Sequence, residues 1–176
     1  DKRGVPTYIH AEGTDIDRDG KTVTVKNLDN GEETVHTYDK LVIAAGARPI
    51  RPDIPGVDAE GVYYLRTVED AVRAESKGRA VIVGGGFIGL EVAEEMALSG
   101  VEVHIYEMMP RLLPFLEESF SEEVLRTLEN HGVHVHLGTG VQEILTDGKT
   151  ASGVRDGNGQ EIQVDLILMS IGVMPN

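Results

Sequence analysis

The chain has 176 residues, a formal net charge of −14, a pI near 4.7 and no cysteine. This acidity argues against nucleic acid or an anionic membrane surface as a partner, and the absence of cysteine excludes disulfides and thiol chemistry. The composition, 40% apolar, suffices for a packed core, whereas the longest uncharged run, residues 80–90, is too short to span a membrane. We therefore expect a soluble, cytoplasmic α/β protein.

The first forty residues predict a β-meander. Polar and apolar side chains alternate over residues 22–25, as in a half-buried strand. The pairs Asp19-Gly20 and Asn30-Gly31 flank this segment and suit tight turns. A third strand is expected over residues 33–38.

A continuous apolar run, LVIAAGA, follows at residues 41–47. Such a run is typical of a strand buried on both faces. Three prolines then interrupt regular structure, which predicts an extended connector over residues 48–56. A short helix is expected over residues 68–75.

From residue 79 the pattern changes to alternating strands and helices. Apolar runs predict buried parallel strands, and apolar residues at helical spacing predict two helices between them. Ser119 and Glu122 fit a capping box at the start of the second helix. The expected strands cover residues 80–83, 101–107, 133–137 and 165–172, the first helix covers 88–99, the second ends near 131–132, and a hairpin turn falls at 156–159.

The first strand of this part runs directly into the glycine motif GGGFIG, which fits GxGxxG and opens the first helix. Gly84 would permit the sharp strand-to-helix turn, and Gly86 would let a pyrophosphate approach the backbone. Gly89 would let the helix pack closely on the strand. The alternative is a tight βα turn that binds nothing.

An acidic residue ends the second strand of this part. Glu107 lies 18 residues after Gly89 and is expected to accept hydrogen bonds from the adenosine ribose hydroxyls. Its charge would repel a 2′-phosphate, which favours NAD(H) over NADP(H), although Arg111 nearby could neutralise a phosphate. The alternative interpretation is a solvated strand end.

Three segments in order resemble the FAD- and NAD(P)H-dependent pyridine nucleotide–disulfide oxidoreductases, and most closely the branch with NADH oxidases, coenzyme A–disulfide reductases and nitrite-reductase-like subunits. They are TYDKLVIAAGARP at 37–49, GGGFIGLEVAEEM at 84–96 and DLILMSIGVMPN at 165–176. The resemblance implies a Rossmann-like, three-layer NAD-binding domain with a parallel sheet, flanked by a β-meander and a strand of an incomplete FAD-binding domain.

The resemblance also sets the expected domain boundaries. Residues 1–75 would belong to the partial FAD domain, 76–172 to the NAD(P)-binding domain, and 173–176 to the return toward the FAD domain. No GxGxxG precedes residue 84, so we expect a fragment that does not bind FAD stably. Its partners would be the dinucleotide and the remainder of the FAD domain, in a parent protein that could be a homodimer.

Hydride transfer from NAD(P)H to FAD is the activity that the resemblance implies. That step needs proximity more than acid–base catalysis, so no catalytic residue is named. Glu91 would lie near the nicotinamide, or would be an ordinary helix-surface acid. The full set of cofactor-binding residues expected from motif and resemblance is Gly84, Gly85, Gly86, Phe87, Ile88, Gly89, Glu91, Glu107 and Gly172, with Ala45 and Gly46 facing FAD in the parent protein.

Three other hypotheses stay open at this point. The chain could be a non-catalytic dinucleotide-sensing or interaction module, or its glycine motif could bind FAD in place of NAD. His134 and His136 alternate along one strand and so share a face. An exposed strand face explains them more simply than a metal site, because no other ligand is apparent nearby.

Overall fold

The computed structural model describes residues 4–65 and 78–176, and the chain forms two compact units, Asp1–Ala45 and Gly46–Asn176. Each unit is described by itself. The helix expected over residues 68–75 lies outside the described residues. No helix in the described ranges is both long and apolar enough to cross a membrane.

The first unit is a three-stranded antiparallel sheet in the order β1-β2-β3. Its strands are β1 (Ala11–Asp17), β2 (Thr22–Asn27) and β3 (Glu33–Thr37), which confirms the expected meander. The turns are held by side chains at strand ends. Asp17 Oδ1 accepts two backbone amides in the first turn, and Asn27 Oδ1 accepts two in the second.

The buried strand expected over residues 41–47 is wrong for most of its length. Residues 41–46 form no strand, and Val42 and Ile43 are 86% and 71% exposed. A strand buried on both faces needs hydrogen-bonded neighbours and covering layers, and no described strand pairs with residues 41–44. Only β4 (Ala47–Pro49), at the end of the run, pairs, antiparallel with β13 (Val173–Pro175).

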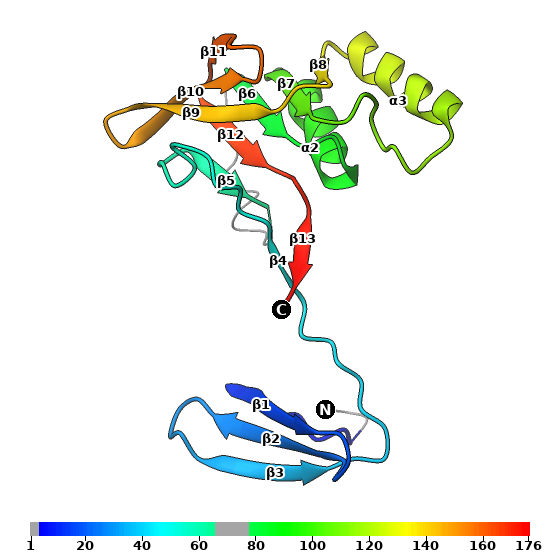
Figure 1. Cartoon of the computed structure of the whole chain (residues 1–176), viewed down its shortest axis with the longest axis vertical. Coiled ribbons are helices and arrows are strands. Elements are labelled where there is room, and N and C mark those ends of the chain that lie inside the picture. The colour runs from blue at the N-terminus through cyan, green and yellow to red at the C-terminus, as the bar shows by residue number, and fades with distance from the viewer. Residues whose placement is uncertain (1–3, 66–77) are drawn as a thin grey trace. The chain divides into compact units, whose positions relative to one another are not determined.

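The second unit is built on a five-stranded parallel sheet in the order β5-β12-β6-β7-β8 (Figure 1). Its strands are β5 (Val62–Tyr64), β6 (Arg79–Val83), β7 (Glu102–Glu107), β8 (His134–Leu137) and β12 (Leu166–Met169). The expected α/β class with a parallel sheet is confirmed. β5 joins this sheet although it precedes residue 76, and the division of the chain at 75/76 stays a prediction.

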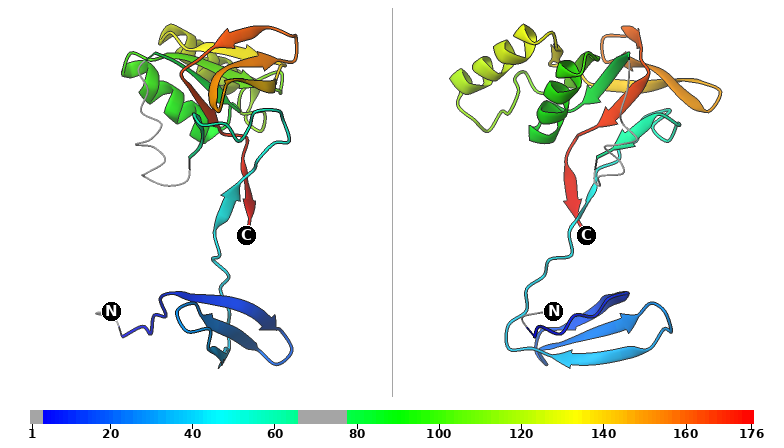
Figure 2. Two further views of the ribbon diagram at one scale, coloured as in Figure 1. Left: turned by 90° about the vertical axis from the view of Figure 1, so that its left-hand side faces the viewer. Right: turned by 180° about the vertical axis from the view of Figure 1, so that it is seen from behind.

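Two different layers cover the parallel sheet (Figure 2). Helices α2 (Phe87–Leu98) and α3 (Glu118–Asn130) pack on one face through one apolar core. A three-stranded antiparallel sheet packs on the other face through a second core. Its strands are β9 (Val141–Asp147), β10 (Thr150–Asp156) and β11 (Glu161–Gln163). The hairpin turn between β10 and β11 was expected, whereas β9 was not.

Glycines end both helices of the second unit. Gly100 and Gly132 follow the C-caps of α2 and α3 with φ of +86° and +81°, a conformation that glycine adopts without strain. The expected capping box is wrong. The N-cap of α3 is Glu117, two residues before Ser119, and no side chain caps it. Because the helix begins earlier than the box requires, Ser119 lies inside the first turn.

Candidate dinucleotide-binding site

A cavity of about 930 Å³ opens at the carboxyl ends of β6, β7 and β12. β6 lies between β7, which follows it in the chain, and β12, which comes from the end of the chain. The strand order of the sheet therefore reverses between β6 and β12. Ligands of open α/β sheets bind at such a reversal point. Twenty residues line the cavity: Pro49, Pro52, Ile54, Leu65, Val83, Gly84, Gly86, Phe87, Ile88, Tyr106, Glu107, Met108, Gly140, Val141, Gln142, Met169, Ser170, Ile171, Gly172 and Val173.

The turn from β6 into α2 requires glycine at Gly84. Its φ is +106°, and its amide donates to the Tyr106 carbonyl at 2.8 Å. A Cβ at this position would collide with the backbone carbonyl of Ser170 on β12's carboxyl side. The neighbouring strand therefore passes too close for any side chain, and the expected role of Gly84 in the sharp turn is confirmed.

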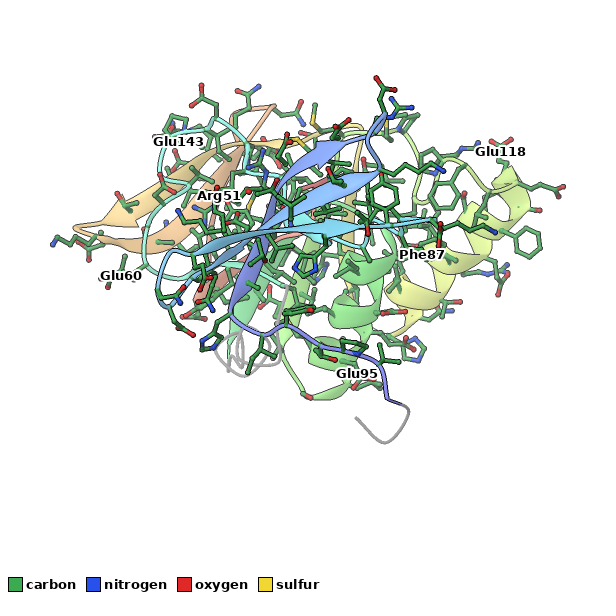
Figure 3. All side chains as sticks on the ribbon, turned by 90° about the horizontal axis from the view of Figure 1, so that it is seen from below. Arg51, Glu60, Phe87, Glu95, Glu118 and Glu143 are labelled. Carbon is green, nitrogen blue, oxygen red and sulfur yellow. The ribbon has the colours of Figure 1, made fainter. Side chains whose placement is uncertain are left out.

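The N-terminus of α2 opens into the cavity. Gly86 is the N-cap, and it lines the cavity together with Phe87 and Ile88, which begin the helix (Phe87 is labelled in Figure 3). No described side chain caps α2. The first amides of a helix lack intrahelical acceptors and carry the positive end of its dipole, so they can bind an anion.

The space beside the backbone at this helix end is open. A Cβ on Gly86 would meet no described atom within 4 Å, so the missing side chain leaves room beside the backbone. None of the lining residues is lysine, arginine or histidine. Backbone amides and the helix dipole therefore supply the positive potential for an anion in this cavity.

Gly89 lies behind the cavity, between α2 and β6. A Cβ here would come within 3.2 Å of Ile82 Cγ2 and 3.3 Å of Ser170 Oγ, and it would collide with the Gly84 carbonyl. Gly89 is buried, as is Ala93 one turn later. Its expected role in close packing of helix on strand is confirmed.

The carboxylate of Glu107 is fixed by two backbone amides at the cavity wall. Glu107 Oε2 accepts from the Gly85 amide at 2.7 Å, and Oε1 accepts from the Met109 amide at 2.8 Å. Each carboxylate oxygen keeps capacity for a further donor. Arg111 does not line the cavity, and its Nη2 donates to the Pro114 carbonyl at 2.7 Å.

The structure brings together six of the residues expected from the sequence, and these line the cavity: Gly84, Gly86, Phe87, Ile88, Glu107 and Gly172. Gly85 and Gly89 support the wall from behind. Glu91 is exposed on α2 and does not line the cavity, nor do Ala45 and Gly46.

Sequence reasoning missed most of the opposite wall. Ser170 and Ile171 follow the carboxyl end of β12, where the reversal rule could have found them. The segment 140–142 enters from the layer that contains β9, which was not expected. Tyr106 also lines the cavity, and burial, with a smaller effect of Asp156, raises the pKa of its phenol.

A parallel sheet with a glycine-rich βα turn and an acidic second strand end defines a Rossmann-type dinucleotide-binding domain. The chain belongs to the pyridine nucleotide–disulphide oxidoreductase family, whose model matches residues 2–176. Members of this family are FAD- and NAD(P)H-dependent flavoproteins.

Individual relatives agree with this assignment. The chain is 37% identical over 169 residues to an NADH oxidase of Enterococcus faecalis, covering 92% of this chain and 37% of that protein. A NAD-dependent persulfide reductase from A. fulgidus is 38% identical with a TM-score of 0.80, covering 94% and 31%. A water-forming NADH oxidase from Lactobacillus brevis, solved with NADH, is 32% identical with a TM-score of 0.78, covering 94% and 38%. The chain thus spans well under half the length of these relatives.

Proposed function

We propose that this chain is the NAD(H)-binding part of an FAD-dependent oxidoreductase in which hydride passes from reduced nicotinamide to flavin. One observation carries the proposal: the uncapped N-terminus of α2 opens into a cavity whose volume of about 930 Å³ suits a dinucleotide. The family assignment supports the same function.

Different residues of the site would bind different parts of the cofactor. The amides at Gly86, Phe87 and Ile88 would hold the diphosphate, and Glu107 would accept hydrogen bonds from the adenosine ribose. Gly172, across the cavity on β12's carboxyl side, would lie toward the nicotinamide end. We also propose Glu91 near the nicotinamide, as the resemblance implies. When bound, the cofactor supplies the hydride, and the chain's own residues bind and orient it.

We further propose a preference for NADH over NADPH. A fixed carboxylate at Glu107 would repel a 2′-phosphate at the ribose. The neighbouring cation, Arg111, is engaged with the Pro114 carbonyl, away from the cavity lining. The balance of charge at this end of the cavity is therefore negative.

FAD would be held mainly by parts of a longer protein. Ala45 and Gly46 would approach the flavin there, and the remainder of the FAD domain would cover the exposed residues 41–43. This chain spans 37% of the Enterococcus faecalis relative, which is consistent with a larger parent of this kind. A homodimeric parent also belongs to the proposal. The terminal electron acceptor would be selected by residues outside this chain.

Direct titration tests the proposal. The purified chain is titrated with NADH and NADPH by calorimetry, in the wild type, Glu107→Arg and Glu107→Gln. We expect saturable NADH binding by the wild type, and a rise of at least about tenfold in the NADPH-to-NADH affinity ratio for Glu107→Arg, equivalent to about 1.4 kcal/mol.

Glu107→Gln is the matched control, because it removes the charge and keeps one oxygen acceptor for the backbone amides. It should change the ratio less than Glu107→Arg does. Thermal unfolding followed by circular dichroism shows whether each variant is folded. A folded wild type that binds neither nucleotide would refute the proposed function, and an unchanged ratio in folded Glu107→Arg would refute the ribose contact.

A further inference from the structure

Three histidines gather on adjacent strands at the edge of the parallel sheet. His104 of β7 is paired in register with His134 of β8, and His136 lies two residues further along β8 on the same face. The rings of His104 and His134 stack with centroids 4.5 Å apart, and those of His104 and His136 stack at 5.4 Å. None of the three histidines lines the dinucleotide cavity, although the ring of His136 stacks on that of the lining residue Tyr106 with centroids 4.3 Å apart.

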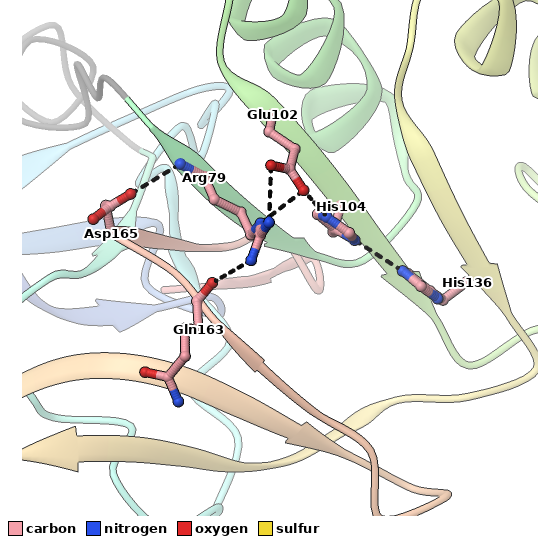
Figure 4. A network of polar contacts seen from close by, with 6 residues as sticks. All are labelled: Arg79, Glu102, His104, His136, Gln163 and Asp165. Atoms are coloured by element: carbon pink, nitrogen blue, oxygen red, sulfur yellow. Dashed lines mark hydrogen bonds and ion pairs between the residues drawn. The ribbon is translucent and has the colours of Figure 1, made fainter.

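A chain of polar contacts runs through the cluster (Figure 4). His104 Nε2 lies 3.1 Å from Glu102 Oε1, and His104 Nδ1 lies 3.1 Å from His136 Nε2. A carboxylate only accepts, so neutral His104 donates through Nε2 and accepts at Nδ1 from the N–H of His136. Glu102 is in turn held by Arg79, through Nε at 2.7 Å and Nη2 at 3.0 Å.

Ligand atoms of Glu102, His104 and His134 all lie within 4.8 Å of one another. We propose that these three residues form a binding site for a borderline divalent transition cation of the Zn²⁺ class. Two imidazoles and one carboxylate are a familiar zinc ligand set, with water in the fourth position. Ligand atoms around tetrahedral zinc are about 3.4 Å apart, and the ring planes of His104 and His134 lie 24° from parallel, so the exposed His134 ring must turn out of its stack on His104 to point a nitrogen at the cation.

The chain of hydrogen bonds lets the cation bind without any net gain or loss of protons by the histidines. The cation takes the position of the proton on His104 Nε2, between that nitrogen and Glu102. His104 then carries its proton on Nδ1 and donates it to His136 Nε2, while His136 carries its own on Nδ1, so the number of protons does not change. His136 becomes a positioning residue that orients the ligand ring, as hydrogen-bond partners of zinc-binding histidines do.

The mixture of nitrogen and oxygen ligands decides which cations the site accepts. The guanidinium of Arg79 fixes the Glu102 carboxylate from the side and offsets its negative charge. Hard cations such as Mg²⁺ and Ca²⁺ take their ligands from oxygen atoms, and this site offers one carboxylate. Imidazole nitrogen binds Zn²⁺ and its neighbours in the transition series well, so the site should select these.

The test is calorimetric titration of the full chain with Zn²⁺, and with Mg²⁺ as the comparison cation. The wild type is compared with His134→Ala, His104→Ala and the control His10→Ala. His10 lies in the first unit, paired with Asp29, so the control removes an imidazole outside the cluster. We expect one saturable Zn²⁺ site in the wild type and in His10→Ala, weakened at least about tenfold in His134→Ala and His104→Ala.

Mg²⁺ should give no saturable heat with any variant. If His104→Ala fails to fold, the exposed His134→Ala variant decides the question by itself. Absence of Zn²⁺ binding in the folded wild type would overturn the proposal, as would equal affinity in the wild type and His134→Ala. The titration contains no nucleotide, so its failure is distinguishable from a failure of the proposed NADH binding.

Discussion

Two apolar runs of this chain look alike as sequences and have opposite fates in the structure. The run at residues 41–46 (LVIAAG) and the run at residues 80–85 (AVIVGG) are both continuous, apolar and closed by glycine. In the first, Val42 and Ile43 are 86% and 71% exposed, whereas Val81 and Ile82 in the second are fully buried.

Neighbouring layers account for the difference. The second run pairs with β12 on one side and β7 on the other, and apolar cores cover both of its faces. Residues 41–44 of the first run belong to no described strand and to neither apolar core of the described residues. An apolar run therefore indicates that a segment is suited to a buried position. The strands and helices that bury it are supplied by other parts of the chain.

The largest difference in stability is expected between two matched truncations, one isoleucine in each run. Ile82→Ala should lower the free energy of unfolding of the second unit by about 2–5 kcal/mol, because it leaves a cavity in a sealed core. Ile43→Ala should change stability by no more than about 0.5 kcal/mol. Urea denaturation, with hydrogen exchange resolved to the amides of β6, measures both. Equal losses of stability in Ile82→Ala and Ile43→Ala would contradict the difference in burial between the two runs.

A smaller effect should follow from adding a methyl group where α2 meets the buried run. Gly89→Ala should cost about 1–3 kcal/mol, because the new Cβ meets Ile82 and the Gly84 carbonyl and must push the helix away. Gly86→Ser is the matched control at the open N-cap. It should keep stability within about 0.5 kcal/mol, since serine is a good N-cap residue and finds free space.

Thermal unfolding of both glycine variants tests this expectation. The serine variant should also bind NADH more weakly than the wild type while remaining as stable, which separates the role of Gly86 in binding from that of Gly89 in packing. A stable Gly89→Ala variant would show that the close approach of helix and strand is not required.

The smallest effect on stability is expected for Val42→Lys, which places a charge in the exposed run. Stability should stay within about 0.5 kcal/mol, but binding of a hydrophobic dye and self-association of the chain should fall, because an exposed apolar segment is a site of association. Thr37→Lys adds the same charge at an exposed polar position and should leave dye binding unchanged. Light scattering and dye fluorescence distinguish the two.

Local rules predicted a large part of the fold and of the site. The glycine spacing at Gly84, Gly86 and Gly89 predicted the βα turn, the open helix end and the close packing, because each depends on the space left by one missing side chain. Glu107 was found because it ends the strand beside this turn. The second wall of the cavity, with Ser170 and Ile171, was missed because it depends on which strand lies next to β6.

The histidine cluster also shows which features the sequence predicts and which it does not, here for single side chains. Alternation along β8 was enough to place His134 and His136 on one face. Their contact with His104 depends on the register between β7 and β8, which lie about thirty residues apart in the sequence.

By itself, the amino-acid sequence determined the class of the protein, the strand–turn–helix unit and the negative charge at Glu107, where the second strand of that unit ends. These are short-range properties, set by glycine conformational freedom, apolar periodicity and the order of a few residues. Only the tertiary structure decided which apolar run was buried, which residues closed the cavity and which histidines met. Those outcomes depend on strand order and register, which arise from contacts between segments far apart in the chain.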